Sequence, residues 1–160
     1  MKKRVNLSTF SFVLTILTFV LILAIAWRFY SRGTTAPAVM LLCALCFLSL
    51  LGLIYMPMSI ELKNGELTLM SSFRFKRFNL SDIESVRLMA PTMGARRIVG
   101  SCGFMGYWGL FREGDIGRYF AYYGKASDCF LVTLKNGRKY MLGCKDAPEM
   151  VDAINAQLKA

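Results

Sequence analysis

The chain has 160 residues, enough for about one domain, but 55% of them are hydrophobic, which is too apolar for an ordinary soluble domain and indicates a membrane protein. The net charge of +10 suits an anionic membrane surface or a nucleic acid. The sequence has no histidine, so the commonest general base and the commonest zinc ligand are both missing. Its five cysteines are irregularly spaced and do not form a disulfide framework, and we expect no metal site and no cofactor.

Two long uncharged runs open the chain, one over residues 5–27 and one over 33–60. The first run makes about 35 Å of helix, enough to cross a hydrocarbon core roughly 30 Å thick. We predict a transmembrane helical hairpin formed by residues 1–58, with spans at about 6–27 and 36–57. Cys43 and Cys46 lie inside the second run without further ligands, as small apolar residues of a membrane helix do.

Basic residues near the ends of these runs predict the orientation. They precede the first run, flank the short link and follow the second run: Lys2, Lys3 and Arg4, then Arg28 and Arg32, then Lys63, Arg74, Lys76 and Arg77. The positive-inside rule therefore places both termini in the cytoplasm, in a multi-pass protein of the inner membrane. An alternative is a cleavable signal peptide ending at Ala24-Ile25-Ala26, but the apolar run is longer than a usual signal core.

Residues 59–160 change to the alternating pattern of β-strands. Four strands are predicted at 59–63, 66–70, 73–78 and 83–88, with Asn64-Gly65 as a hairpin turn. In the third of these, residues 73–78, aromatic and basic side chains alternate, as in a half-buried strand. Three more strands follow at 119–123, 129–134 and 139–142, with a second turn at Asn136-Gly137. An amphipathic helix over 146–158 ends the chain and begins with a capping-box spacing.

This order is the pleckstrin homology (PH) topology. We predict a mixed fold, with the N-terminal two-helix transmembrane hairpin followed by a mainly-β PH-like domain over 59–160. The domain has seven antiparallel strands in two bent sheets and a C-terminal capping helix. An irregular glycine- and aromatic-rich insertion over 90–118 separates the fourth strand from the fifth.

Three segments also resemble a known family. They are Asn79-Leu-Ser-Asp-Ile-Glu-Ser-Val86, the glycine-aromatic stretch 97–109, and the stretch 130–142 that leads into the helix. The chain resembles the bacterial PH domain family, and in particular small membrane proteins with two transmembrane helices and one PH-like domain. The resemblance implies a non-catalytic binding or scaffolding role and no particular ligand.

The glycine-aromatic segment and its basic neighbours are the candidate membrane or partner contacts: Phe104, Met105, Tyr107, Trp108, Phe111, Arg96, Arg97 and Arg112. In one interpretation the rings lie in the headgroup layer with the arginines near phosphates. In the other, the rings fill the domain core or pack on the membrane helices, and the glycines allow positive φ or close backbone approach. The sequence leaves both open.

Other function classes fit the sequence poorly. The glycines at 100, 103, 106 and 109 match neither nucleotide-binding glycine motif, and Ser101 and Cys102 have no histidine to activate them. An RNA-binding module of four strands would carry helices between them. The basic loop used by eukaryotic phosphoinositide-binding PH domains is reduced here to Asn64-Gly65.

We therefore expect a non-enzymatic, membrane-anchored PH-like binding or assembly module at the cytoplasmic membrane surface. Its candidate partners are the bilayer itself, anionic lipid headgroups, and a protein partner or a second copy of the chain, but not nucleic acid. The alternative is a protein-interaction or self-assembling subunit of a larger membrane complex without lipid recognition, which salt dependence would distinguish from lipid binding.

Overall fold

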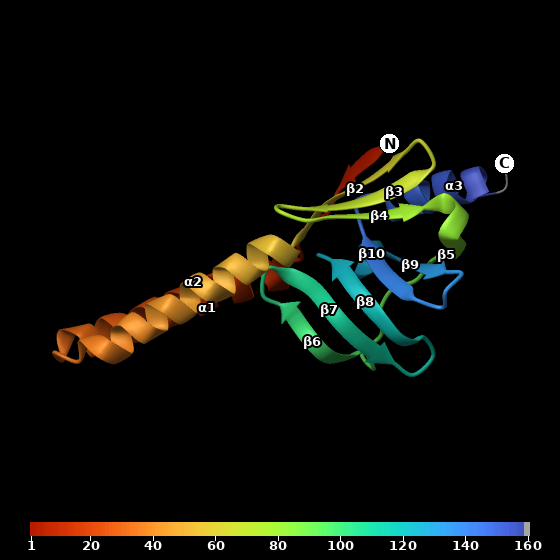
Figure 1. The fold of residues 1–160 in the computed structure, drawn as a ribbon. Coiled ribbons are helices and arrows are strands. Elements are labelled where there is room, and N and C mark those ends of the chain that lie inside the picture. Colours follow the sequence, from red (N-terminus) through yellow and green to blue (C-terminus); the bar gives the residue numbers. More distant parts are fainter. Residues whose placement is uncertain (159–160) are drawn as a thin grey trace.

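Two long helices project from one side of a mainly β domain, and a third helix lies at the opposite end of that domain (Figure 1). The computed structural model describes residues 1–158. In chain order the elements are β1 (Lys2–Arg4), α1 (Thr9–Ser31), α2 (Thr35–Tyr55), β2 (Pro57–Lys63), β3 (Glu66–Ser71), β4 (Phe75–Asn79), the 3-10 helix η1 (Leu80–Asp82), β5 (Ile83–Leu88), β6 (Arg96–Gly103), β7 (Gly106–Glu113), β8 (Gly117–Tyr123), the 3-10 helix η2 (Ala126–Asp128), β9 (Cys129–Leu134), β10 (Lys139–Gly143) and α3 (Ala147–Leu158).

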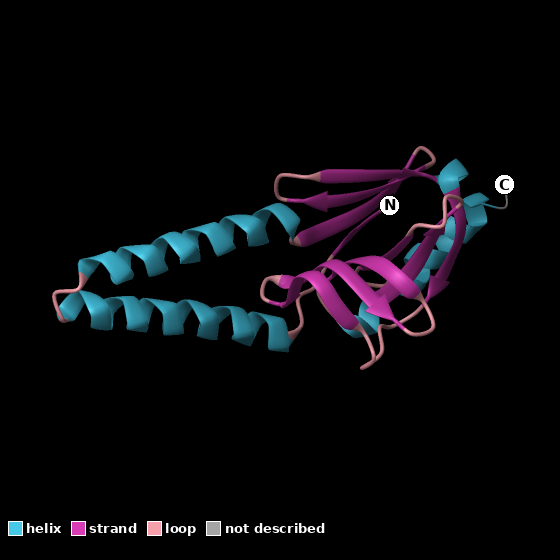
Figure 2. Cartoon of the chain, turned by 60° about the horizontal axis from the view of Figure 1, so that its bottom comes forward, coloured by secondary structure: helices cyan, strands magenta, loops and turns pink. Residues whose placement is uncertain are grey.

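Helices α1 and α2 form an antiparallel hairpin that opens toward the domain (Figure 2). Ser8 caps α1 by accepting a hydrogen bond from the backbone N–H of Ser11 at 3.1 Å. Both helices are long and apolar enough to cross a membrane, and only 11% and 17% of their apolar windows are buried. Because the core helix of a soluble protein would be mostly buried, this exposure fits the two membrane helices that the sequence predicts.

The first sheet has the order β1-β2-β3-β4, and its neighbours are antiparallel. The turn between β2 and β3 is Asn64-Gly65, with both residues at positive φ, as the sequence predicts. Strand β1 is not predicted, because three residues are too few to show an alternating pattern. Lys3 of β1 forms ion pairs with Asp146 at 3.2 Å and Glu149 at 2.5 Å, which ties the strand to the start of α3.

The second sheet has the order β5-β9-β10-β8-β7-β6. All seven predicted strands are present, but β5 lies in this sheet, and β8 and β10 are parallel rather than antiparallel. The connection through η2 carries the chain past β10, so β9 enters the sheet on the far side of β10. Strand β10 then returns beside β8 in the same direction.

The section 90–118 differs from its prediction as an irregular insertion, because most of it is β structure. Strands β6 and β7 form a hairpin paired from Arg96 and Arg112 to Gly103 and Gly106, and β7 pairs with β8 to extend the second sheet. Glycine is depleted in strands, so its recurrence among the aromatic residues hid the strand pattern.

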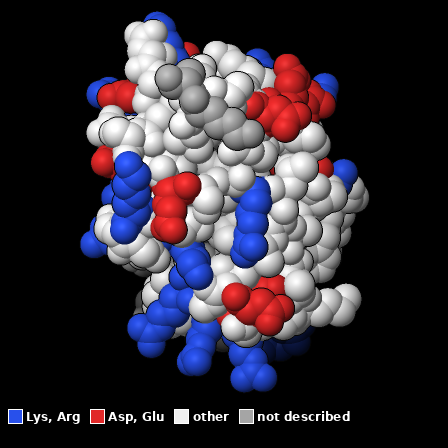
Figure 3. Space-filling model, turned by 90° about the vertical axis from the view of Figure 1, so that its right-hand side faces the viewer, with Lys and Arg blue, Asp and Glu red and all other residues white. Residues whose placement is uncertain are grey.

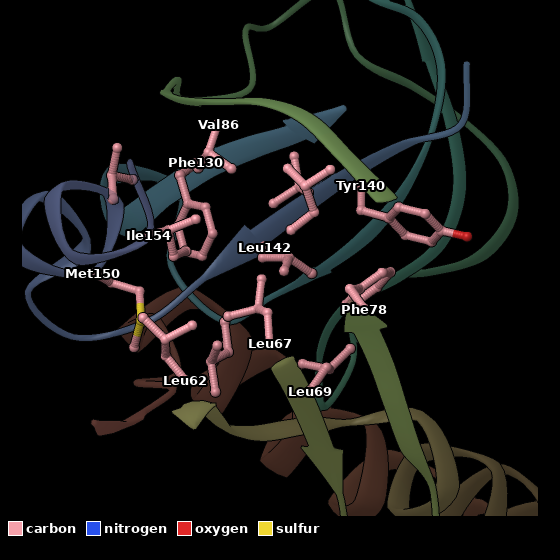
Figure 4. Packing of buried hydrophobic residues seen from close by; sticks show 14 of the residues in the cluster. Leu62, Leu67, Leu69, Phe78, Val86, Phe130, Tyr140, Leu142, Met150 and Ile154 are labelled. Carbon is pink, nitrogen blue, oxygen red and sulfur yellow. The ribbon is translucent and has the colours of Figure 1, made fainter. Parts of the chain in front are cut away.

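The main core lies between the two sheets and beneath α3 (Figure 4). The first sheet contributes Leu62, Leu67 and Leu69, the second Phe130, Tyr140 and Leu142, and α3 contributes Met150 and Ile154. The ring of Phe78 meets that of Tyr140 edge-on, with centroids 4.8 Å apart. The apolar face of α3 thus covers the open end between the sheets, as its amphipathic pattern predicts.

Candidate functional site

The turn of the β6–β7 hairpin lies against both long helices. The backbone N–H of Met105 donates a hydrogen bond to Oγ1 of Thr15 in α1 at 2.9 Å. The Met105 side chain lies against Gly52 of α2, where an added Cβ would be 2.1 Å from the Met105 sulfur. The ring of Phe104 stacks on Phe19 of α1, with centroids 6.0 Å apart. The turn therefore contacts α1 and α2 together, near the end where the helices diverge (Figure 2).

Close approach of the two strands explains the glycines at 100 and 109. Gly100 and Gly109 are directly paired, and both have φ of +122°, which residues with a side chain rarely adopt. A Cβ on Gly100 would lie 2.1 Å from the carbonyl oxygen of Trp108, and one on Gly109 would lie 2.2 Å from that of Val99. These glycines therefore serve the backbone geometry of the hairpin.

Trp108 packs between the hairpin and the C-terminal end of α2. Its ring stacks on that of Tyr55 with centroids 5.1 Å apart, and its indole N–H is buried without an acceptor in the described part of the chain. Beside it is a cavity of about 280 Å³, lined by Leu14, Thr18, Leu48, Leu51, Arg97, Gly100, Ser101, Phe104 and Trp108. The hairpin and both helices thus bound a largely apolar space with one basic side chain in its wall.

The structure divides the eight candidate residues. Tyr107 stacks on Tyr123 with centroids 4.8 Å apart, and Phe111 is buried in the core at 2% exposure, so the Phe111 ring does not reach the surface. Arg96 and Arg112 are exposed and lie opposite one another at the end of the hairpin away from its turn. The candidates that meet at the long helices are Phe104, Met105, Trp108 and Arg97.

Exposed apolar side chains near the helix bases form a second feature, which the sequence analysis missed. Phe73 and Phe75 at the β3–β4 turn are 69% and 65% exposed, and Met58 beside them is 50% exposed. Arg74 in the same turn places its guanidinium 5.2 Å from the ring centre of Tyr55, at the end of α2. Ile98 and Val99, also exposed, lie on β6 between two residues that line the cavity at the helices. We call Met58, Phe73, Phe75, Ile98 and Val99 the apolar rim.

The alternation over 73–78 has a different register from the one expected for a half-buried aromatic strand. Phe75 is exposed, whereas Lys76 turns inward and its ammonium lies 4.2 Å from the ring centre of Tyr140 and 5.1 Å from that of Phe120. Cation–π attraction stabilises the lysine in this position. Because neighbouring residues of a strand face opposite sides, Phe75 points outward and belongs to the apolar rim.

Charge is distributed unevenly along the domain. Acidic and basic side chains are mixed on the end that faces away from the long helices (Figure 3). In the sequence, the charged neighbours of the rim are Arg74, Lys76 and Arg97, although Phe75 also lines a hollow that contains Glu61 and Glu66.

Two of the three thiols of the domain and one carboxylate are buried, whereas the thiol of Cys102 is exposed. Burial raises the pKa of the Cys129 thiol and raises that of Cys144 to about 12, so neither has the lowered pKa of an activated nucleophile. The buried carboxylate of Glu113 accepts hydrogen bonds from the backbone N–H of Thr92 at 2.9 Å and from the hydroxyl of Tyr119 at 3.3 Å. Within residues 1–158, no three metal-ligating side chains are grouped.

Comparison with known proteins assigns the domain to a family. The model of the family described as "Bacterial PH domain" matches residues 58–158, which is more than half of the chain and runs through both sheets to α3. No curated protein and no solved structure gives a significant match. The PH-like domain and its position after two apolar helices are as the sequence predicts. The chain belongs to the bacterial PH domain family.

Proposed function

We propose that this protein is a non-enzymatic, membrane-anchored binding module whose PH-like domain acts at the cytoplasmic surface of the inner membrane. Helices α1 and α2 cross the bilayer, and both termini lie in the cytoplasm. The apolar rim carries the proposal, because it places exposed apolar side chains of the domain beside the bases of two apolar helices. In that position they enter the headgroup layer instead of facing water.

The distribution of basic residues supports this orientation. Three basic residues precede α1 and several follow α2, whereas the far end of the helix hairpin has only Arg28, in the last turn of α1, and Arg32, in the link. Positive charge near the ends of spans favours the cytoplasmic side. Anionic lipids of that leaflet attract each nearby lysine or arginine by about 1 kcal/mol.

The packing of the hairpin supports a fixed position of the domain on the membrane. Only Met56 separates α2 from β2, so the connection is not a flexible linker. The hydrogen bond from Met105 to Thr15 and the contact of Met105 with Gly52 add a second attachment on both helices. A domain held in this way presents one end to the bilayer and leaves the other end for a partner.

Depth-dependent fluorescence quenching tests the proposal. In the full-length chain, Trp27→Phe and Trp108→Phe remove the native tryptophans, and Phe75→Trp places a single reporter in the rim. We expect lipids brominated on their acyl chains to quench this reporter in phosphatidylglycerol-containing vesicles. Met93→Trp in the same background is the control, because Met93 is fully exposed in the loop before β6, at the end of the hairpin away from the helices. Equal quenching at the two positions, or none at Phe75→Trp, would refute the proposal.

A second candidate function, self-assembly or protein binding without lipid recognition, is favoured by the edge of β4. This strand ends the first sheet, so the backbone groups along its outer edge have no strand partner within the described residues. An unpaired edge can accept a strand from another chain. Light scattering of the full chain in detergent at low and high salt tests this candidate, since association by strand addition survives salt that screens surface charge.

A further inference from the structure

We propose that the crevice at the base of the two long helices binds the headgroup of an anionic phospholipid. The crevice has a volume of about 1200 Å³ and lies where the N-terminal segment and the start of β2 join the helices. Its lining residues are Lys2, Arg4, Val5, Asn6, Leu7, Ser8, Thr9, Met56, Met58, Ser59 and Lys125. The inference rests on the proposed function in one respect, because the helices bring the crevice to the headgroup layer.

Three cations and no carboxylate line this crevice. Lys2 and Arg4 come from β1, and Lys125 comes from the connection between β8 and β9. Both ion pairs within residues 1–158 are made by Lys3, so none of the three lining cations is neutralised by a carboxylate there. Glu61 lies opposite Lys2 in the strand register but lines a different hollow, which leaves Arg4 and Lys125 as the principal pair. The charge of the crevice suits a phosphate diester.

Apolar side chains also line the crevice where the chain joins the helices, beside the polar residues Asn6, Ser8 and Thr9. Leu7 and Met56 lie in the connections to α1 and α2, and the exposed side chain of Met58 belongs to the rim. A phospholipid has the same order of groups along its length, with a charged phosphate above the glycerol and the first methylenes. A soluble phosphate would use the cations and leave the apolar wall in water, so we assign the ligand to the lipid.

Backbone hydrogen bonds hold the wall of the crevice in place. The N–H of Val5 donates to the carbonyl of Met58 and the N–H of Ser8 to that of Gly124, both at 2.9 Å, and the N–H of Lys145 donates to the carbonyl of Arg4 at 2.8 Å. Gly124 permits this close approach, since a Cβ there would lie 2.2 Å from the carbonyl oxygen of Asn6. Arg4 and Lys125 are therefore carried on two segments that are fixed to one another, and the site needs little ordering when it binds.

Native mass spectrometry of the full-length chain in nonionic detergent tests the inference, with phosphatidylglycerol and phosphatidylcholine as competing probes. The test variant combines Lys2→Gln, Arg4→Gln and Lys125→Gln. The control combines Lys63→Gln, Arg77→Gln and Arg138→Gln, which removes the same charge from exposed positions outside the crevice. We expect the native chain and the control to bind phosphatidylglycerol in preference to phosphatidylcholine. In the test variant, the ratio of bound phosphatidylglycerol to bound phosphatidylcholine should fall about tenfold or more.

Two further arms keep the result interpretable. Lys125→Gln alone, outside any strand, must weaken the preference even if the changes in β1 disturb the sheet. Glycerol phosphate added in excess must fail to displace the lipid; if it displaces the lipid, the ligand is a soluble phosphate and the inference is wrong. Equal losses in the test and control variants, or no preference in the native chain, would also overturn it. Because rim quenching does not depend on lipid charge, a failure of this site is distinguishable from a failure of the proposed function.

Discussion

Two hairpins of the second sheet, β6–β7 and β9–β10, reach the same secondary structure by different means. The hairpin β9–β10 is held by side-chain packing, since Phe130, Val132 and Leu142 are fully buried. Its turn residue Gly137 has open space around it. In β6–β7 the backbone itself is packed, because Gly100 and Gly109 bring the strands close together. We therefore expect β9–β10 to tolerate substitutions in its turn but not at the buried positions of its strands. In β6–β7, substitutions should destabilise the fold wherever two glycines lie close together.

The strongest test of this comparison is Gly100→Ala beside Gly137→Ala. Alanine at 100 would have φ of +122° and a Cβ 2.1 Å from a carbonyl oxygen, so backbone strain and overpacking together cost about 3 kcal/mol of unfolding free energy. Alanine at 137 has φ of +77° and no atom within 4 Å, and costs about 1 kcal/mol. Thermal unfolding of the full chain in detergent, followed by circular dichroism, measures both. Equal losses would mean that close strand approach in β6–β7 is unimportant.

A smaller loss of stability is expected from breaking the contact between the β6–β7 turn and α1. The β9–β10 turn has no hydrogen bond of this kind to a helix among the described residues. The hydroxyls of Thr15 and Thr18 both donate to a carbonyl one turn back in α1, but that of Thr15 also accepts the N–H of Met105. Thr15→Val therefore leaves a donor unpaired and should cost about 1–2 kcal/mol more than Thr18→Val.

Hydrogen exchange locates this second effect. We expect Thr15→Val to speed amide exchange in the turn around Met105 and to leave the turn at Asn136-Gly137 unchanged. Thr18→Val should change neither turn. If the two valine variants behave alike, the hydrogen bond to Thr15 does not hold the hairpin on the helix.

A third comparison of the two hairpins concerns the accessibility of their thiols and involves no loss of stability. Cys102 on β6 is exposed, whereas Cys129 at the start of β9 and Cys144 after β10 are buried, and burial raises the pKa of both buried thiols. With Cys43 and Cys46 replaced by serine, maleimide at pH 8 should label Cys102 and reach the other two only after unfolding. Rapid labelling of Cys129 in the folded chain would contradict the packing described for β9.

The same burial predicts a pH dependence. Above pH 9, near the ordinary thiol pKa, the unfolded chain releases protons that folded Cys129 and Cys144 retain, so the folded state binds more protons and stability falls as pH rises. Burial also raises the pKa of Tyr119 and Tyr123, which extends the fall above pH 10. Unfolding midpoints between pH 8 and pH 11 measure it, and serine at 129 and 144 should reduce the slope.

The parts of the fold that repeat a side-chain pattern could be predicted from the sequence. The two apolar helices, the turns at Asn64-Gly65 and Asn136-Gly137 and the amphipathic helix α3 each follow from local periodicity. The hairpin β6–β7 could not be predicted in this way, because it depends on close contact between the backbones of its paired glycines and not on an alternating side-chain pattern. Strand β1 could not, because its partner β2 is more than fifty residues away in the chain.

The candidate site was predictable only in part. The glycine-aromatic segment was identified, and Phe104, Met105 and Trp108 do meet at the helices. The three arginines Arg96, Arg97 and Arg112 look alike in the sequence, but only Arg97 lines the cavity at the helices. Arg96 and Arg112 form the outermost pair of the hairpin, and neighbouring side chains such as those of Arg96 and Arg97 point to opposite faces of a strand. The crevice residues are separated by more than a hundred positions, and no local pattern joins Arg4 to Lys125.

Strand β1 has a topological consequence. Because it is hydrogen-bonded to β2, the first residues of the chain must lie on the same side of any membrane as the domain, and the segment between them must cross an even number of times. Cleavage after Ala26 would remove β1, leave β2 as an open edge and strip Asp146 and Glu149 of Lys3. The segment that most resembles a cleavable signal peptide thus contains the strand that completes the first sheet.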